Sequence, residues 1–115
     1  MEIKVSKNDD NTFLMELSGA MDLCSSNHLK ELVMKSIKNK AEGFIINLTE
    51  VHSINSTGIG ALINVFSTLK KLSCPLVIIA PEGPVMKALE ATRLKSYFTI
   101  VASLKDALSL MATKL

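Results

Sequence analysis

Two short apolar segments, separated by a helical pattern, constrain the fold of this chain more than any other feature. The segments are GFIINL at residues 43–48 and PLVIIA at residues 75–80, and both are apolar almost without interruption. Such runs are typical of strands that lie inside a sheet and are covered on both faces. The residues between them have an apolar spacing of three or four, which predicts a helix with one buried stripe formed by Ile59, Leu62, Ile63, Phe66, Leu69 and Leu72. Strand, helix and strand in this order require parallel pairing through a right-handed crossover.

The remaining segments extend this unit into a mixed α/β sheet. Residues 1–6 and 12–19 predict an antiparallel hairpin, because KNDDN joins two strand-like runs. A helix is expected from about Ser26, capped by Ser25 or Ser26 and ending near KNKAEG at residues 38–43, where Gly43 suits a stop. Further along we expect a helix with Pro84 in its first turn, a strand at 97–101 and a closing helix capped by Ser103. The predicted order is ββαβαβαβα with about four helices, covering the sheet on one side or on both.

Side-chain patterns also predict which residues are buried. Ile46, Leu48, Ile63, Phe66 and Ile78 are the expected centre of the core. In the closing helix the inward-facing residues are predicted to be Leu104, Ala107, Leu108 and Met111. The length of 115 residues suits a single domain over 1–115.

Composition excludes several classes of function. The net charge is only +2, from 13 basic and 11 acidic residues, and the lysines are spread along the sequence, so direct nucleic-acid binding is not expected. The apolar runs are far shorter than the ~20 residues of a membrane span, and the first residues lack a signal-peptide pattern, so no membrane insertion is expected. Two isolated cysteines, Cys24 and Cys74, indicate reduced thiols and a cytoplasmic location.

Polar residues follow three of the predicted strands, where functional loops of such sheets usually lie. Asp22, Ser56, Thr57 and the Pro81–Pro84 turn are therefore expected on one surface. Either Asn55 or Ser56 can cap the helix that starts there. Its N-terminus tolerates a phosphate, and Gly58 is expected to serve the close approach of a partner more than folding.

Motifs of enzymes are not matched by this stretch. GIG is not completed to GxGxxG, and INSTG is not the GxSxG turn of a serine hydrolase. His28 and His52 are the only histidines that could act as a base, and no spacing rule places either on a nucleophile. We therefore expect no catalytic residue, no metal and no cofactor.

One motif resembles the signature of a known family. INLTEVHSINSTGIG is similar to the central motif of the STAS domain family, the anti-sigma factor antagonists, except that Asn47 and Asn55 stand where Asp is usual. LSGAMD resembles the loop after the second strand of that family. Residues 80–108 resemble its last helices and short strand, with Arg93 in place of a common Gly.

This resemblance implies a regulatory protein rather than an enzyme. In phosphorylated members a kinase that is also an anti-sigma factor modifies the Ser after the motif's Asp, which here is Ser56, with Thr57 as the second candidate. The unmodified protein binds the kinase and frees a sigma factor, phosphorylation prevents binding, and a phosphatase resets the switch. The expected partner-binding residues are Asp22, Asn55, Ser56, Thr57, Gly58, Ile59, Gly60 and Glu82.

Asn55 leaves alternatives open, because it removes a carboxylate beside the acceptor. One alternative is an unphosphorylated docking subunit of a larger assembly such as a lipid-transport ATPase. Another is a module that binds a nucleotide or a lipid. The oligomeric state, monomer or weak dimer, stays open as well.

Overall fold

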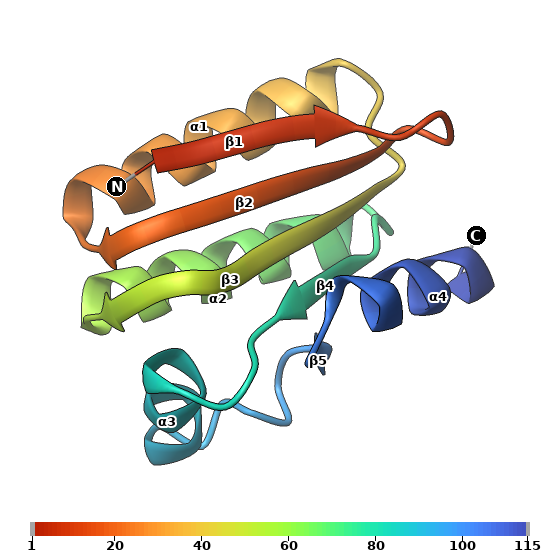
Figure 1. Cartoon of the computed structure of the whole chain (residues 1–115). Helices are drawn as coiled ribbons and strands as arrows, with labels where there is room; N and C mark the ends of the chain where they lie inside the picture. Colours follow the sequence, from red (N-terminus) through yellow and green to blue (C-terminus); the bar gives the residue numbers. More distant parts are fainter. Residues whose placement is uncertain (1, 115) are drawn as a thin grey trace.

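A five-stranded mixed sheet runs through the protein in the spatial order β1-β2-β3-β4-β5 (Figure 1). The computed structural model describes residues 2–114. β1 pairs antiparallel with β2, and all other neighbouring strands are parallel. The predicted order and sheet type are therefore confirmed, with elements β1 (Glu2–Lys7), β2 (Thr12–Met21), α1 (Leu23–Lys38), β3 (Gly43–Ile54), α2 (Ser56–Lys71), β4 (Leu76–Ile79), α3 (Pro84–Ala91), β5 (Ile100–Val101) and α4 (Leu104–Lys114).

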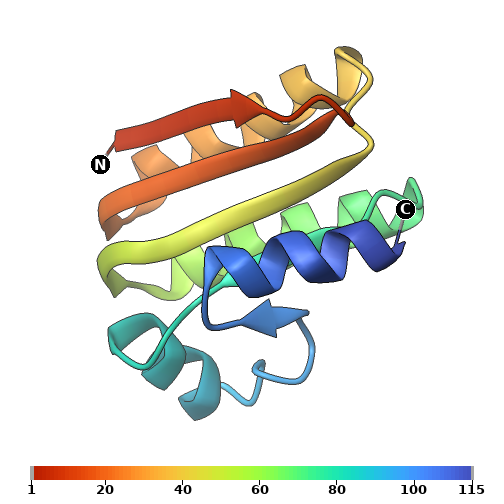
Figure 2. The ribbon, with the colours of Figure 1, turned by 45° about the vertical axis from the view of Figure 1, so that its right-hand side comes forward.

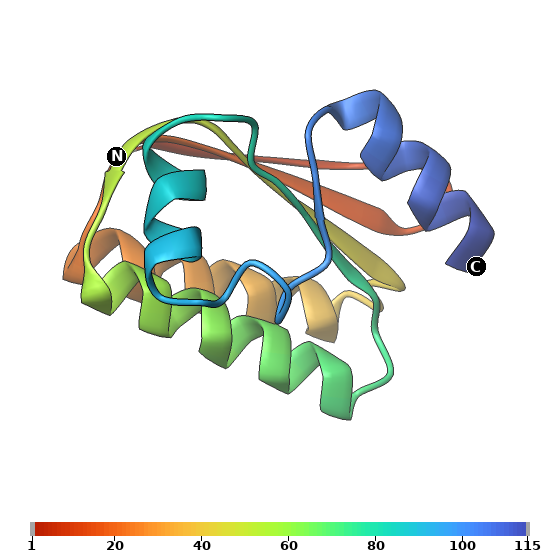
Figure 3. The ribbon, with the colours of Figure 1, turned by 90° about the horizontal axis from the view of Figure 1, so that it is seen from below.

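Helices cover both faces of the sheet, but unequally. α1, α2 and α3 lie on one face, and α4 lies alone on the other (Figures 2 and 3). The larger core therefore fills the space between the sheet and three helices. A smaller cluster lies under α4 and consists of Ile45, Val77, Ile79, Ala107 and Met111.

Two parallel strands are longer than predicted. The residues after Leu48, expected to form a loop, continue β3 as far as Ile54, and β2 continues to Met21. The register between β2 and β3 shifts twice, so that β3 carries two extra residues. Because each β-bulge leaves an extra residue unpaired, β3 can contain polar residues whose sequence is typical of a loop.

The start of α1 differs from the prediction, whereas its end lies in the predicted stretch. Asp22, and not Ser25 or Ser26, is the N-cap. Ser25 completes a capping box, because its amide donates to Asp22 Oδ1 at 3.1 Å and its Oγ accepts from the Asp22 amide at 2.9 Å. The helix ends at Lys38, within the predicted stretch 38–43, and Lys40 rather than Gly43 adopts a left-handed φ, of 64°, just past its end. Gly43 instead opens β3, where a Cβ would lie 2.9 Å from Met111 Sδ of α4.

The buried stripe of α2 is rotated from the predicted one. The helix turns small residues towards the sheet, so that its buried residues are Gly58, Ala61, Leu62, Val65 and Leu69. Ile63 and Phe66 are only partly buried, and the Leu72 side chain is 54% exposed, so these three predictions are wrong. Phe66 packs on its flank against Phe98, with ring centroids 5.4 Å apart.

The other core predictions have mixed outcomes. Ile46, Leu48 and Ile78 are fully buried, as predicted. In α4 the buried residues are Ala107 and Met111, whereas the side chains of Leu104 and Leu108 are exposed, contrary to the prediction. β5 keeps only two residues of the strand expected at 97–101.

Candidate functional site

The N-termini of α1 and α2 form the candidate site, at the edge of the sheet where β2 and β3 end. Met21 and Ile54 are the last residue pair of the two parallel strands. The Asn55 amide donates to the Met21 carbonyl at 3.4 Å, which ties the two strand ends together. Asp22 and Asn55, the N-caps of the two helices, therefore follow neighbouring residues. The expected meeting of Asp22 with the Ser56 segment is confirmed.

Asn55 supplies the cap of α2. It has an extended backbone, with φ −99° and ψ −178°, and its Oδ1 accepts from the Gly58 amide at 2.9 Å. Of the two residues that could have capped the helix, Asn55 does so. Ser56 is the first residue of the helix and is exposed, and its hydroxyl has no hydrogen-bond partner within residues 2–114. The Ser56 hydroxyl is therefore not needed for the local structure.

The two glycines of this segment have different surroundings. Gly58 is buried, and a Cβ there would lie 2.8 Å from Ile54 Cγ1 and 3.0 Å from the Met21 carbonyl oxygen. Gly60 is exposed, and a Cβ there would meet nothing within 4 Å. The expectation that Gly58 serves partner approach more than folding is wrong, because Gly58 lets α2 pack against the strand ends. Gly60 is the position with open space.

Exposed side chains occur at the start of both helices. Thr57 is exposed beside it, and Ile59 is partly buried one turn further on. Leu23, which the sequence analysis missed, exposes 62% of its side chain directly after the cap of α1. The signal in the sequence was the spacing of Asp22 and Ser25, which marks a capping box and hence a helix that already starts at Leu23.

Asp22 is a charged residue that directly follows Met21, the last residue of β2 at this edge of the sheet. Hydrogen bonds from the Ser25 backbone and side chain hold the pKa of the Asp22 carboxyl below its ordinary value, because they stabilise the charged form. The surface beside Ser56 therefore carries a negative charge at neutral pH.

The turn that contains Glu82 lies elsewhere along β3. It borders a small hollow of about 30 Å³ whose other wall is formed by Leu48, Thr49 and Val51. Glu82 is exposed there, next to the middle of β3 rather than at its end. The structure thus brings together Asp22 and residues 55–60. The Pro81–Pro84 turn with Glu82 was expected on the same surface, but it lies beside the middle of β3 instead.

Asn47, the other residue that departs from the family motif, has a local role. Its Oδ1 accepts hydrogen bonds from the backbone amide of Thr49 at 3.0 Å and from the Thr49 hydroxyl. Thr49 is one of the residues at the first β-bulge, so Asn47 supports the irregular part of β3.

Within residues 2–114 no helix is both long and apolar enough to cross a membrane. The same part of the chain contains no group of three or more His, Cys, Asp or Glu placed to hold a metal ion.

Comparisons with known proteins agree on one fold. The model of the STAS domain family matches residues 2–107. An anti-sigma factor antagonist from Mycobacterium paratuberculosis superposes with a TM-score of 0.84 at 20% identity, over 95% of this chain and 92% of that one. The Bacillus cell fate determinant SpoIIAA in its phosphorylated form has a TM-score of 0.74 at 15% identity, over 96% and 99% of the two chains.

A transporter protein shares the same fold. A sulfate transporter family protein from Wolinella succinogenes superposes with a TM-score of 0.78 at 18% identity, over 90% of this chain and 87% of that one. A search of curated protein sequences finds no significant match. At these identities the structural likeness establishes the fold, and the function needs its own argument.

Proposed function

The chain belongs to the STAS domain family, and from this premise we propose that it is an anti-sigma factor antagonist controlled by phosphorylation of Ser56. In the unmodified state its Ser56 surface binds an anti-sigma factor with serine kinase activity, and a sigma factor is released. Phosphorylation ends the binding, and a cognate phosphatase restores it. The protein acts in the cytoplasm as a substrate and a docking partner, not as an enzyme.

One observation carries this proposal: the Ser56 hydroxyl is exposed and has no structural task. Asn55 already caps α2, so a phosphate on Ser56 displaces no hydrogen bond of the fold. The phosphate would sit at the N-terminus of a 16-residue helix, whose unpaired amides and partial positive charge favour an anion. The modification is therefore compatible with the folded state.

The same phosphate would oppose docking. It adds a charge of about −1.5 to −2 at pH 7, beside the carboxylate of Asp22 and within a segment, residues 41–69, that contains no Lys or Arg. A close partner would have to desolvate this charge, and each ~1.4 kcal/mol of lost interaction weakens binding tenfold. An interface centred on Ser56 would thus respond to a single modification.

The direct test is phosphorylation by the anti-sigma serine kinases of the same genome, followed by mass spectrometry. We expect phosphate on Ser56, loss of the reaction in Ser56→Ala, and an intact reaction in Thr57→Ala. The free energy of unfolding of Ser56→Ala should lie within about 0.5 kcal/mol of the wild-type value, because the Ser56 hydroxyl does not cap the helix. Ser56→Asp should weaken kinase binding at least tenfold. Phosphate on Thr57 alone, or full binding by Ser56→Asp, would contradict the proposal.

A second candidate is an unphosphorylated docking subunit of a larger assembly, such as a lipid-transport ATPase. Asn55 favours it, since a neutral amide stands where phosphorylated members have a carboxylate. Asn55→Asp is the matched variant, because Asp caps a helix as well as Asn does. If the kinases modify Asn55→Asp but not wild type, the second candidate holds.

A small-ligand module has less support. Four hollows described within residues 2–114 measure about 480, 360, 330 and 300 Å³, and none of them is lined by residues 55–60. No cavity described in this part of the chain therefore supports a nucleotide or lipid site at Ser56.

A further inference from the structure

We propose that the C-terminal ends of α1 and α2 form a docking surface for anionic lipid bilayers, separate from the Ser56 surface and independent of the function proposed for it. The surface is a group of six lysines, here called the lysine patch. Lys35 and Lys38 belong to the last turn of α1, and Lys70 and Lys71 to the last turn of α2. Lys30 lies earlier on α1, and Lys40 follows the end of that helix.

The fold brings together lysines that are spread along the sequence. α1 and α2 pack side by side and both run away from the Ser56 edge, so they end at the same side of the molecule (Figure 1). On α1, Lys30, Lys35 and Lys38 surround a hollow of about 360 Å³. Lysines that are spread along the sequence thus lie at the same end of the helix pair.

Charge is separated along the helix axes. Residues 8–29 and 41–69, which include the Ser56 edge, contain no Lys or Arg at all. Each helix has 16 residues and spans about 24 Å. None of the six lysines forms an ion pair within the described residues, whose one such pair joins Lys95 to Glu90. The positive charge of the lysine patch is thus available to an external partner.

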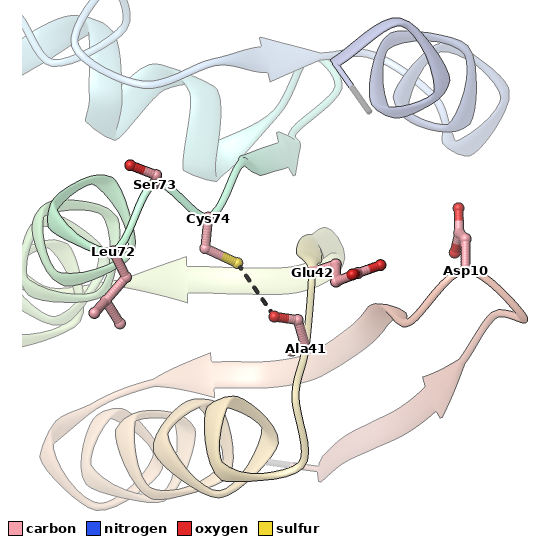
Figure 4. Close-up of a pocket in the computed structure, with 6 residues that line it drawn as sticks. All are labelled: Asp10, Ala41, Glu42, Leu72, Ser73 and Cys74. Atoms are coloured by element: carbon pink, nitrogen blue, oxygen red, sulfur yellow. Dashed lines mark hydrogen bonds between the residues drawn. The ribbon is translucent and has the colours of Figure 1, made fainter.

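Helix ends and nearby carboxylates reduce this charge only in part. Each helix C-terminus contributes about −0.5 charge, and Glu31 lies on the same face of α1. Asp10 and Glu42 line a hollow of about 480 Å³ whose other side is formed by Leu72, and Figure 4 shows both carboxylates on the side away from α2. They belong to the β1–β2 turn and the α1–β3 loop rather than to the helix layer.

Two exposed apolar side chains favour a bilayer over other polyanions. Met34 lies among the α1 lysines and is 48% exposed, and Leu72 follows Lys71 and is 54% exposed. A nucleic acid offers phosphates but gains little from aliphatic side chains, whereas a bilayer accepts both. Because the structure has no membrane-spanning helix within residues 2–114, the contact is peripheral. Ser56, at the other end of both helices, would stay accessible.

The test is co-sedimentation of the full chain with phosphatidylcholine vesicles that contain 30% phosphatidylglycerol, and with pure phosphatidylcholine vesicles as the uncharged control. We expect binding to the anionic vesicles only, and weaker binding at 300 mM than at 50 mM salt. Each lysine near such a surface strengthens binding about fivefold. The triple variant Lys35→Glu, Lys38→Glu, Lys71→Glu should therefore lose more than a hundredfold.

A matched control separates the lysine patch from net charge. Lys4→Glu, Lys87→Glu, Lys105→Glu makes the same charge change at exposed positions elsewhere, and should weaken binding less than tenfold. Met34→Ser should weaken vesicle binding severalfold and leave binding to a 20-base-pair DNA duplex unchanged. The proposal is overturned if anionic vesicles are not bound at 50 mM salt, if both triple variants lose equally, or if the DNA duplex binds more tightly than the vesicles.

Discussion

One added methyl group at Gly58 or at Gly60 should change the stability of this protein in opposite directions. The two positions lie two residues apart on α2, so Gly→Ala brings the same gain in helix propensity, about 1 kcal/mol, at both. At Gly60 nothing opposes this gain, because a Cβ there meets no atom within 4 Å. Gly60→Ala should therefore be stabilised by about 1 kcal/mol.

At Gly58 the methyl group would collide with the ends of both strands. It would lie 2.8 Å from Ile54 Cγ1, 3.0 Å from Met21 Cγ and 3.0 Å from the Met21 carbonyl oxygen. Side chains can turn away, but the Met21 carbonyl cannot. It accepts a hydrogen bond from the Asn55 amide, and Met21 is held by its pairing with Ile54 of β3. The start of α2 must move, and such overpacking costs about 1–3 kcal/mol. After the propensity gain, a net loss of up to about 2 kcal/mol remains.

Urea titration of wild type and both variants measures this contrast. The midpoints should order as Gly60→Ala, wild type, Gly58→Ala, with unchanged slopes. The free energies of unfolding of the two variants should differ by the overpacking cost alone, about 1–3 kcal/mol. Gly60→Ala also serves a second purpose, since it alters the open surface near Ser56 without harming the fold. If Gly58→Ala is as stable as Gly60→Ala, α2 does not pack on the strand ends as described.

Three further predictions concern other parts of the fold. Arg93 has a left-handed φ of 60°, so Arg93→Gly should raise the free energy of unfolding by about 0.5–1 kcal/mol in urea, and any loss would refute the strain. The lowered pKa of Asp22 means that its contribution is present above the unfolded-state pKa and lost as pH falls through the folded one. The stability difference between wild type and Asp22→Asn should therefore shrink from pH 6 to pH 2.5, and a constant difference would exclude the Ser25 hydrogen bonds as its cause. Phe66→Ala should lower the free energy of unfolding by about 2–3 kcal/mol, because the edge contact with Phe98 is lost. The cost is smaller than for a fully buried Phe because Phe66 is only partly buried. A loss below about 1 kcal/mol would contradict this packing.

The order of elements could be predicted because the sequence separates two kinds of periodicity. Continuous apolar runs mark β3 and β4, and a spacing of three or four marks α2 between them. Parallel pairing and the crossover then follow from chain connectivity. The position of Ser56 at the start of a helix could be predicted in the same way.

Orientation and end points were harder, and each error has a physical cause. The buried side of α2 was assigned from its large residues, whereas close packing on the sheet selects Gly58 and Ala61. β3 was ended too early because bulges let a strand hold polar residues that normally mark a loop. The choice of Asn55 over Ser56 as the cap depends on backbone geometry that residue types alone do not specify.

The unequal lengths of β3 and β4 have a consequence for local motion. The last β4 partner of β3 is Asn47, so residues 48–54 have a hydrogen-bonded strand on the β2 side only, as far as the described residues go. α3 occupies the other side through buried Val85, Met86 and Leu89. Local unfolding of α3 therefore breaks apolar contacts but leaves the hydrogen bonds between the strands intact. We expect α3 to unfold locally at a lower free energy than the whole domain, next to the strand that precedes Ser56. Hydrogen exchange should show α3 amides exchanging through local opening and the β2–β3 amides only through global unfolding, and a partner that rests on the Glu82 turn will slow α3 exchange although no atom near Ser56 has moved.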